Sequence, residues 1–373
     1  MTRAAIEAEL LAWMKSADWT PDPKRFDRIA LELFRFQYER CKPYELLCRT
    51  IGRTPDSART ASDVPAVPTG AFKEFELRCF DASETIRTFR TSGTSTDRRG
   101  ELHLDRLDVY EASLLSSLRH CLLPRSAGAR PIERMRFLAP SPDEAPHSSL
   151  SYMFGALCEA EGGASSGFDL RGDRLDSASL RIAVRDAWRE DEPMLIAGTA
   201  FAFVHFLDER GDETWDLPAG SRVMETGGFK GRSRVVPRSV LHAELADCFA
   251  IPEGSVVNQY GMTELGSQFY DSTIIDPSGP RRKLAPPWTR VRFADPATGQ
   301  DAPSGEVGLI LVQDLANSGS IAAIQTADLG RAILDDEGRA IGFEIIGRAE
   351  GAEARGCSIA TDIMLEAARG GSK

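Results

Sequence analysis

Hydrophobic residues near the start of the chain recur at helical spacing. They appear every three or four positions between Ala4 and Met14 and again between Ile29 and Tyr38, and a further such pattern runs from Leu107 to Leu123. A repeat close to 3.6 residues places these side chains on one face of a helix. The sequence therefore predicts two amphipathic helices at the start and another further along the chain.

Shorter apolar runs alternate with helical patterns in the middle of the chain. We predict strands at Thr85 to Arg90, Met135 to Ala139, Met194 to Gly198 and Ser255 to Asn258. Strands that alternate with helices are typical of α/β folds with a largely parallel sheet. Polar residues are concentrated directly after the last of these strands, at the end where open α/β sheets bind their ligands.

The pattern changes beyond Pro286. The short β-prone runs in this part are Val291 to Phe293, Val307 to Gln313 and Ile341 to Ile346. Turn residues separate them, which predicts a small, mostly antiparallel subdomain. We therefore expect an N-terminal helical segment (1–64) packed on an α/β core (65–285), followed by a small β-rich subdomain and tail (286–373).

Composition narrows the class of protein. Of the 373 residues, 42% are hydrophobic and 27% are charged, and the formal net charge is −11. An acidic globular protein is poorly suited to nonspecific nucleic-acid binding. No stretch approaches the roughly 20 apolar residues of a membrane span, and the first residues do not resemble a secretory signal. We therefore expect a cytoplasmic protein with no nucleic-acid partner and no membrane span.

A hydroxyl-rich turn follows the predicted strand that ends at Arg90. It consists of Thr91, Ser92, Gly93, Thr94 and Ser95. Hydroxyls and backbone N–H groups around a glycine can surround phosphate oxygens. The segment lacks the GxxxxGK[ST] pattern of a P-loop, and taken alone it would be interpreted as a solvated turn.

A second polar segment follows the predicted strand that ends at Asn258. Its residues are Tyr260, Gly261, Thr263 and Glu264. The ring could flank a base, the hydroxyl could contact phosphate, and the carboxylate could hold Mg²⁺, which often shares its oxygen ligands with substrate phosphates. The alternative is a strand-to-helix turn in which Thr263 or Glu264 caps the next helix.

Two later segments complete an ordered series. Asp328 lies in a predicted loop from Gln325 to Arg331, where it is an ordinary turn residue or accepts hydrogen bonds from both ribose hydroxyls. The last segment runs from Gly347 to Gly356. In this order the four segments resemble the phosphate loop, YGxTE, (S/T)GDLG and GRxxDxxxxxG motifs of the acyl-adenylate-forming superfamily, which includes acyl-CoA synthetases and luciferases. Ala327 replaces a glycine that is usual there.

Other segments resemble one family within this superfamily, the acyl-protein synthetases of the LuxE type, which supply fatty acyl groups to an acyl reductase. They are Pro68 to Lys73, Ser148 to Met153, Gly198 to Phe201 and Arg355 to Ser358. The resemblance covers about residues 65–362 and implies an α/β adenylate-forming domain with a small β-rich subdomain. Few residues follow Cys357, so we expect this chain to lack the superfamily's mobile C-terminal lobe and its catalytic lysine.

The resemblance also implies a role for each motif residue. Thr91 to Ser95 and Thr263 would contact phosphate, Glu264 would hold Mg²⁺, and Asp328 would bind the ribose of ATP. The other nucleotide-binding residues that it implies are Gly227, Gly228, Tyr260, Gly261 and Arg348.

Two lysines could neutralise the charge that the missing lysine meets elsewhere in the superfamily. We favour Lys230 as a catalytic residue over Lys73, because Lys230 follows the adenine segment directly. Each could also be a surface residue, since lysine side chains are mostly exposed.

Cys357 is the candidate nucleophile among seven cysteines. Arg355 lies nearby, and a cationic neighbour favours the reactive thiolate. The family's acyl-cysteine intermediate favours the same residue, whereas the other six are expected to be buried and inert. The seven cysteines lack CxxC spacing, which argues against a disulfide framework or a zinc site.

These residues predict an enzyme that uses ATP and Mg²⁺ to convert a carboxylic acid, with a fatty acid favoured, into acyl-AMP. The acyl group would pass to Cys357 and then to a partner protein, such as an acyl reductase or a carrier protein. Two alternatives stay open at this point. One is direct transfer from acyl-AMP to CoA, a carrier thiol or an amine, and the other is a catalytically silent nucleotide-binding subunit of an acyl-reductase complex.

Overall fold

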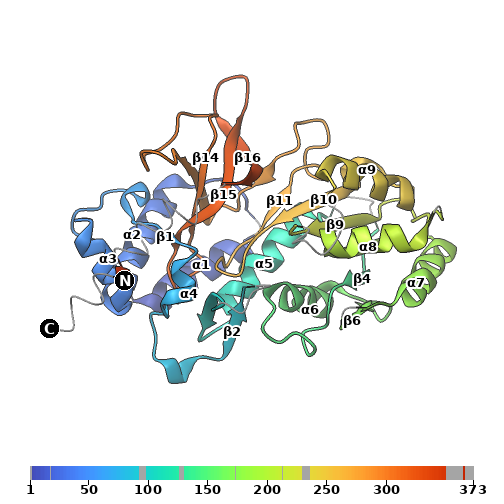
Figure 1. Ribbon diagram of the computed structural model, residues 1–373, viewed down its shortest axis with the longest axis horizontal. Helices are drawn as coiled ribbons and strands as arrows, with labels where there is room; N and C mark the ends of the chain where they lie inside the picture. The colour runs from blue at the N-terminus through green and yellow to red at the C-terminus, as the bar shows by residue number, and fades with distance from the viewer. Residues whose placement is uncertain are drawn as a thin grey trace. The chain divides into compact units, whose positions relative to one another are not determined.

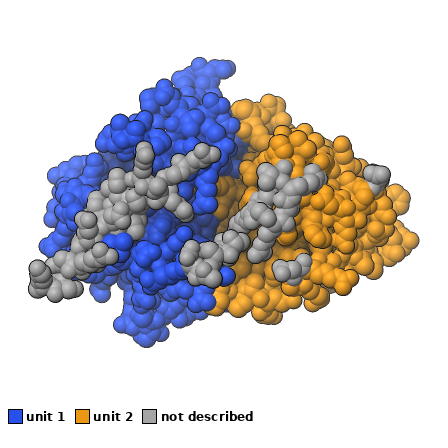
Figure 2. All heavy atoms as spheres, viewed as in Figure 1, with its two compact units in different colours: residues 1–116, 262–267, 282–373 blue, residues 117–261, 268–281 orange. Residues whose placement is uncertain are grey.

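The computed structural model describes residues 2–16, 18–91, 98–125, 130–172, 174–211, 213–228, 236–349 and 364–365. Two compact units make up the chain, and Figure 2 colours them separately. Unit 1 comprises residues 1–116, 262–267 and 282–373, and unit 2 comprises residues 117–261 and 268–281. The three-part division expected from the sequence stays a prediction.

Unit 1 begins with three helices, α1 (Arg3–Lys15), α2 (Pro23–Arg40) and α3 (Lys42–Thr50). The two helices predicted at the start of the chain are confirmed. Proline at the first position of α2 presets a helical φ and lacks an N–H that would need a partner there. The apolar faces of α1 and α2 form one buried cluster with Trp288 and Leu315.

The strands of unit 1 are mostly antiparallel. They are β1 (Val67–Pro68), β2 (Arg87–Arg90), β3 (Glu101–Leu104), β12 (Lys283–Leu284), β13 (Thr289–Ala294), β14 (Gly308–Asp314), β15 (Ala323–Leu334) and β16 (Ala340–Arg348). β13, β14, β15 and β16 pair antiparallel in that order, and β12 pairs antiparallel with β16. β1 pairs parallel with β15, and β2 with β3 forms a separate antiparallel pair. The antiparallel strands expected beyond Pro286 are therefore confirmed.

The prediction of a loop around Asp328 is wrong, because residues 325–331 lie inside β15 between β14 and β16. The register of β15 against β16 shifts between Leu329 and Gly330. A side chain at position 330 would place its Cβ 2.5 Å from the carbonyl oxygen of Glu344, so this strand position requires glycine. Glycine at a strand irregularity resembles a turn signal in the sequence, which explains the error.

Two helices complete this part of the chain, α4 (Ala71–Glu74) directly after β1 and α5 (Asp108–Cys121) after β3. The predicted strand ending at Arg90 and the predicted helix from Leu107 to Leu123 correspond to β2 and α5. α4 contacts both β1 and β3. This contact fixes Phe72 and Lys73 beside the β2–β3 pair.

Unit 2 contains a mainly parallel set of strands. They are β4 (Arg134–Leu138), β5 (Gly167–Phe168), β8 (Met194–Thr199), β9 (Arg222–Thr226), β10 (Val256–Tyr260) and β11 (Phe269–Asp271), together with the hairpin of β6 (Leu170–Arg171) and β7 (Arg174–Leu175). The order β10, β9, β8, β4, β5 is parallel throughout, and β11 pairs antiparallel with β10. The parallel sheet predicted for this region is confirmed.

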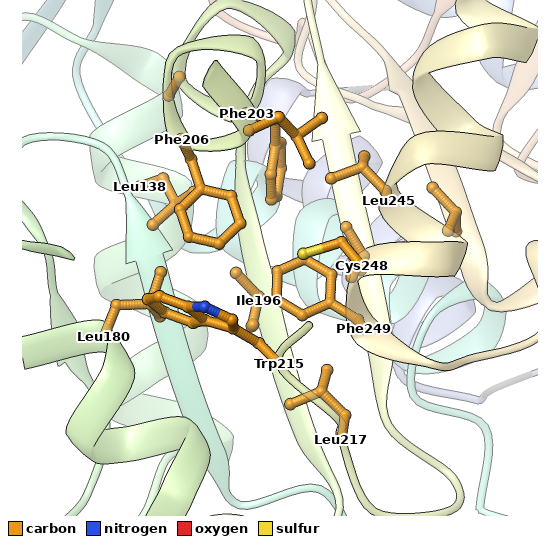
Figure 3. Close-up of a cluster of buried hydrophobic side chains, with 14 of the residues drawn as sticks. Leu138, Leu180, Ile196, Phe203, Phe206, Trp215, Leu217, Leu245, Cys248 and Phe249 are labelled. Carbon is orange, nitrogen blue, oxygen red and sulfur yellow. The ribbon is translucent and has the colours of Figure 1, made fainter. Parts of the chain in front are cut away.

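Helices cover both faces of these strands. They are α6 (Ser149–Glu161), α7 (Ser177–Glu190), α8 (Ala200–Arg210) and α9 (Arg238–Phe249), and Figure 1 shows their positions in the chain. In Figure 3, Leu138 and Ile196 point toward Phe206 and Phe249 in a buried cluster that α7, α8 and α9 supply. Successive side chains of a strand face opposite sides, and Phe137 stacks on Phe154 of α6 at 4.7 Å. This is an α/β arrangement, as the sequence predicted.

Among the residues that the structure describes, no helix combines the length and apolarity that crossing a membrane needs.

Candidate active site

Glu264 lies in a tight turn of unit 1, and only 7% of its surface is exposed. The Leu265 N–H donates to the Met262 carbonyl oxygen at 3.2 Å, and the Asn317 side-chain amide donates to the Glu264 carbonyl oxygen at 2.8 Å. The next element is strand β11, which removes the helix-cap alternative for Thr263 and Glu264. The turn is thus held by its own backbone and by Asn317.

A buried polar network holds the end of this turn. The carboxylate of Asp314 accepts the N–H and the hydroxyl of Ser267, both at 2.7 Å. The indole N–H of Trp288 reaches the hydroxyls of Ser113 at 2.9 Å and Ser267 at 3.1 Å. Burial raises the pKa of Asp314 to about 6 although these hydrogen bonds lower it. The sequence did not reveal this network, because its members come from segments far apart in the chain.

The electrostatic surroundings of Glu264 are unusual for a carboxylate. Its pKa is raised from 4.5 to about 7, mainly by burial and to a smaller extent by the charge of Asp328, while a backbone hydrogen bond and the charges of Lys73 and Arg348 only partly oppose the rise. A cation bound at the carboxylate would favour its ionised form. The described residues contain no group of three or more His, Cys, Asp or Glu side chains placed to hold a metal ion. The carboxylate of Glu264 is an oxygen ligand of the kind that Mg²⁺ prefers.

Strand pairing delivers the charged neighbours of Glu264. β1 runs parallel to β15, and α4 with Lys73 follows β1 directly. Asp328 lies opposite Arg348 in the β15–β16 register, with 3.9 Å between the Asp328 Oδ1 and Arg348 Nε atoms. The Asp328 N–H donates to the Thr326 hydroxyl at 3.1 Å. Residues from three separate sequence segments thus surround one buried carboxylate.

Thr91, the first residue of the predicted phosphate segment, and Gly100 lie beside the same carboxylate. The Thr91 N–H donates to the Gly100 carbonyl oxygen, and the Gly100 N–H donates to the Thr91 hydroxyl, both at 2.9 Å. A Cβ at Gly100 would lie 3.5 Å from Glu264 Oε1. The Thr263 hydroxyl is 3.4 Å from the Arg90 carbonyl oxygen, to which it donates. Thr91, Thr263 and Glu264 are therefore brought together.

Several predicted site residues lie outside the described residues, and their roles stay predictions. They are Ser92, Gly93, Thr94, Ser95, Lys230 and Cys357.

The remaining predicted nucleotide residues belong to unit 2. Tyr260 ends β10, and Gly227 directly follows β9, whose last residue pairs with Gln259. Gly227 has φ +77°, a left-handed conformation that favours glycine. Gly228 and Gly261 follow these two positions in the chain. Strand pairing therefore brings the Gly227 and Tyr260 segments to the same end of the parallel strands.

A second buried glutamate, Glu225, lies just before these glycines. Its Oε1 atom accepts from the Asn258 amide at 2.7 Å and lies 3.0 Å from the His242 Nε2 atom and 3.1 Å from the Arg238 Nε atom. The Arg238 guanidinium also donates to the Gly227 carbonyl oxygen at 3.2 Å. Glu225 thus anchors the Gly227 turn, a function that no local sequence pattern indicated.

A family model described as "Acyl-protein synthetase, LuxE" matches residues 6–366. The chain belongs to this family. It is therefore an acyl-adenylate-forming ligase, and the resemblance found in the sequence is confirmed. A search of curated protein sequences found no significant match.

Solved structures of other adenylate-forming enzymes share the fold of this LuxE-family chain. One is 2-hydroxyisobutyryl-CoA ligase in an open conformation with 2-HIB-AMP and CoA, with a TM-score of 0.62, 15% identity, and coverage of 89% of this chain and 76% of that chain. The same ligase in the postadenylation state with 2-HIB-AMP has a TM-score of 0.61, 17% identity, and coverage of 89% and 69%. The adenylate-forming fold expected for this family member is therefore confirmed.

Proposed function

We propose that this chain uses ATP to activate a carboxylic acid as acyl-AMP at the Glu264 site and then passes the acyl group through Cys357 to a partner protein. One observation carries the first step. Residues of four separate motifs, Thr91, Glu264, Asp328 and Arg348, converge within unit 1 around a single buried carboxylate. Each motif alone has an ordinary structural explanation, but their convergence does not.

In the activation step, a carboxylate oxygen of the acid attacks the α-phosphorus of ATP. The bond from that phosphorus to the oxygen bridging the β-phosphorus breaks, and pyrophosphate leaves. Such chemistry depends mainly on positioning and charge neutralisation. Asp328 would accept hydrogen bonds from the ribose hydroxyls, and Thr91 and Thr263 would donate hydrogen bonds to phosphate. Lys73 and Arg348 would supply positive charge. Mg²⁺ held by Glu264 would neutralise phosphate charge when bound.

In the transfer step, the Cys357 thiolate attacks the carbonyl carbon of acyl-AMP, forming a thioester and releasing AMP. A nucleophile of the partner then attacks the thioester and returns the electron pair to the sulfur. The described cysteines are poor rivals: burial raises the pKa of Cys48 to about 12, that of Cys248 to about 11, and also that of Cys158. A hydrogen bond from Cys79 lowers the pKa of Cys41, but only 1% of Cys41 is exposed.

The test is intact-mass measurement of wild type and Cys357→Ser after incubation with ATP and a panel of carboxylic acids. Wild type should acquire an acyl adduct that hydroxylamine removes. Cys357→Ser should lack this labile adduct yet still release pyrophosphate for at least one turnover, because a serine hydroxyl is a far weaker nucleophile than a thiolate. Cys158→Ser, a change at a half-buried thiol, is the matched control and should keep the adduct.

Two outcomes would contradict the proposal in different ways. If wild type forms adenylate but never an adduct, transfer goes directly to CoA, a carrier thiol or an amine. If no carboxylic acid supports pyrophosphate release at all, the chain is a silent nucleotide-binding subunit.

A further inference from the structure

Gln37 is a buried polar residue of α2, and both ends of its side-chain amide contact one loop. The amide nitrogen donates to the Asn317 carbonyl oxygen at 2.9 Å, and the amide oxygen accepts from the Ala322 N–H at 3.1 Å. Gln37 is 0% exposed, and a buried amide needs such partners because it has lost its hydrogen bonds to water. Gln37 therefore holds two positions of the loop at once.

This loop, residues 315–322, connects β14 to β15 and contains no helix or strand. Its conformation therefore depends on contacts with other segments. The Ser318 hydroxyl donates to the Glu7 Oε1 atom of α1 at 2.7 Å, and the Gly319 carbonyl oxygen accepts from the Cys79 N–H at 2.9 Å. Together with Gln37, these contacts mean that two helices at the start of the chain restrain adjacent residues of the loop.

The same loop holds the turn that carries Glu264. The Asn317 backbone contacts Gln37, and the Asn317 side-chain amide donates to the Glu264 carbonyl oxygen at 2.8 Å. The loop and the turn also pack closely, because a Cβ at Gly266 would lie 2.9 Å from the Ala316 Cβ atom. A displacement of Asn317 would therefore displace the backbone of Glu264 as well.

We propose that Gln37 is a positioning residue for adenylation, which fixes Asn317 and through it the place of the Glu264 carboxylate. This inference rests on the proposed function, because it requires Glu264 to take part in adenylation. Small displacements of a reacting or charge-neutralising group reduce the rate strongly, since the reaction depends on alignment. The four superfamily motifs begin at Thr91, so the inference gives the N-terminal helices a part in the site.

The experiment compares Gln37→Met with wild type in ATP–pyrophosphate exchange dependent on a carboxylic acid. Methionine has a similar length but makes neither hydrogen bond, so kcat should fall about tenfold or more. The KM for ATP should stay within about threefold of wild type, because strand pairing rather than Gln37 holds Asp328. The matched control is Tyr44→Phe on α3, which deletes a buried hydroxyl that donates to the Pro65 carbonyl oxygen at 2.8 Å. It should exchange as wild type does.

A double-mutant cycle with Asn317→Ala separates positioning from a general loss of stability. Asn317→Ala already removes the link to Glu264, so adding Gln37→Met should lower kcat by less than about twofold further. Two independent structural effects would multiply instead. Thermal melting checks that each variant is folded at the assay temperature. Should Gln37→Met not fold, Gln37→Glu takes its place: it keeps the size and an acceptor for the Ala322 N–H, loses the donor to Asn317, and should also lose kcat.

A folded Gln37→Met or Gln37→Glu with the kcat of wild type would overturn the proposal. So would an equal fall of kcat in Tyr44→Phe or multiplicative losses in the cycle, since either result assigns Gln37 to stability alone. The two proposals fail separately. Exchange that Glu264→Gln loses but folded Gln37→Met keeps contradicts the positioning inference alone, whereas no exchange by wild type with any acid contradicts the adenylation proposal.

Discussion

Two buried glutamates, one in each unit, have opposite surroundings. The carboxylate of Glu225 is 0% exposed and has Asn258, His242 and Arg238 within hydrogen-bonding or ion-pairing distance. Glu264 is nearly as buried, but burial prevails over the charges of its neighbours and raises its pKa to about 7. Direct hydrogen bonds can stabilise a buried carboxylate in place of the water that it loses on burial. Charges at longer range compensate for that loss only incompletely. Glu225 is therefore a structural anchor held through its Oε1 atom, although its Oε2 atom is buried without a hydrogen-bond partner in the described part of the chain. For Glu264 we propose that a ligand supplies the missing partner.

Among the changes that test this comparison, we expect the largest effect from Asp328→Ala, beside Glu264, and it should appear in the affinity for ATP. Two charge-assisted hydrogen bonds to the ribose, worth about 1.5 to 3 kcal/mol each, would be lost. The apparent affinity for ATP should fall by about 100-fold or more. Titration with ATP in a pyrophosphate-exchange assay measures the change, and Asp301→Ala, at an exposed carboxylate paired with Arg292, is the control. An unchanged affinity would remove Asp328 from the site.

In the absence of ligands, the free energy of unfolding should depend on pH differently in wild type and in the neutral variant Glu264→Gln. Its folded-state pKa is raised, so the native state favours the protonated form, and stability is lost as pH rises from about 4.5 through about 7. Relative to Glu264→Gln, wild type should lose up to about 3 kcal/mol of unfolding free energy across this range. Urea unfolding at pH 5 and pH 8 measures the difference. If the stability of wild type and of Glu264→Gln changed equally with pH, the ionised Glu264 carboxylate would already be stabilised by its neighbours.

A smaller loss of stability is expected when Glu225, the other buried glutamate, loses one of its hydrogen-bond donors. Asn258→Ala deletes the 2.7 Å hydrogen bond to the buried Glu225 carboxylate. A hydrogen bond to a charged group contributes about 2 kcal/mol, so the urea midpoint should fall with little change in slope. A loss below about 0.5 kcal/mol, the size typical of surface substitutions, would show that Glu225 does not depend on this donor.

Hydrophobic spacing predicted the elements that carry strong local patterns. The helices α1, α2 and α5 and the strands β4, β8 and β10 correspond to predicted runs. β15 was missed because Asp328 and Gly330 interrupt its apolar residues, and only pairing with β14 and β16 makes the segment a strand. Local sequence predicts a helix or strand well where the pattern of its own residues determines it. It predicts a strand poorly where pairing with neighbouring strands determines it.

The site shows the same limit. Motif order led us to propose Glu264 and Asp328 as site residues, whereas the residues that support Glu264 come from other segments of the chain. Asn317, Asp314 and Trp288 act through tertiary contacts with the 262–267 turn, and no spacing in the sequence links them to it. Lys73 was expected to be secondary to Lys230, yet the structure places Lys73 within electrostatic reach of Glu264.

The measurement that tests the central claim most directly is ATP–pyrophosphate exchange dependent on a carboxylic acid, compared between Glu264→Gln and Glu225→Gln. Both changes neutralise a buried carboxylate at nearly constant size. If adenylation takes place at Glu264, Glu264→Gln should fold normally and lose about 100-fold or more in exchange, because an anionic Mg²⁺ ligand is removed. Folded Glu225→Gln should retain most of its exchange activity. Near-wild-type exchange by folded Glu264→Gln would contradict the account.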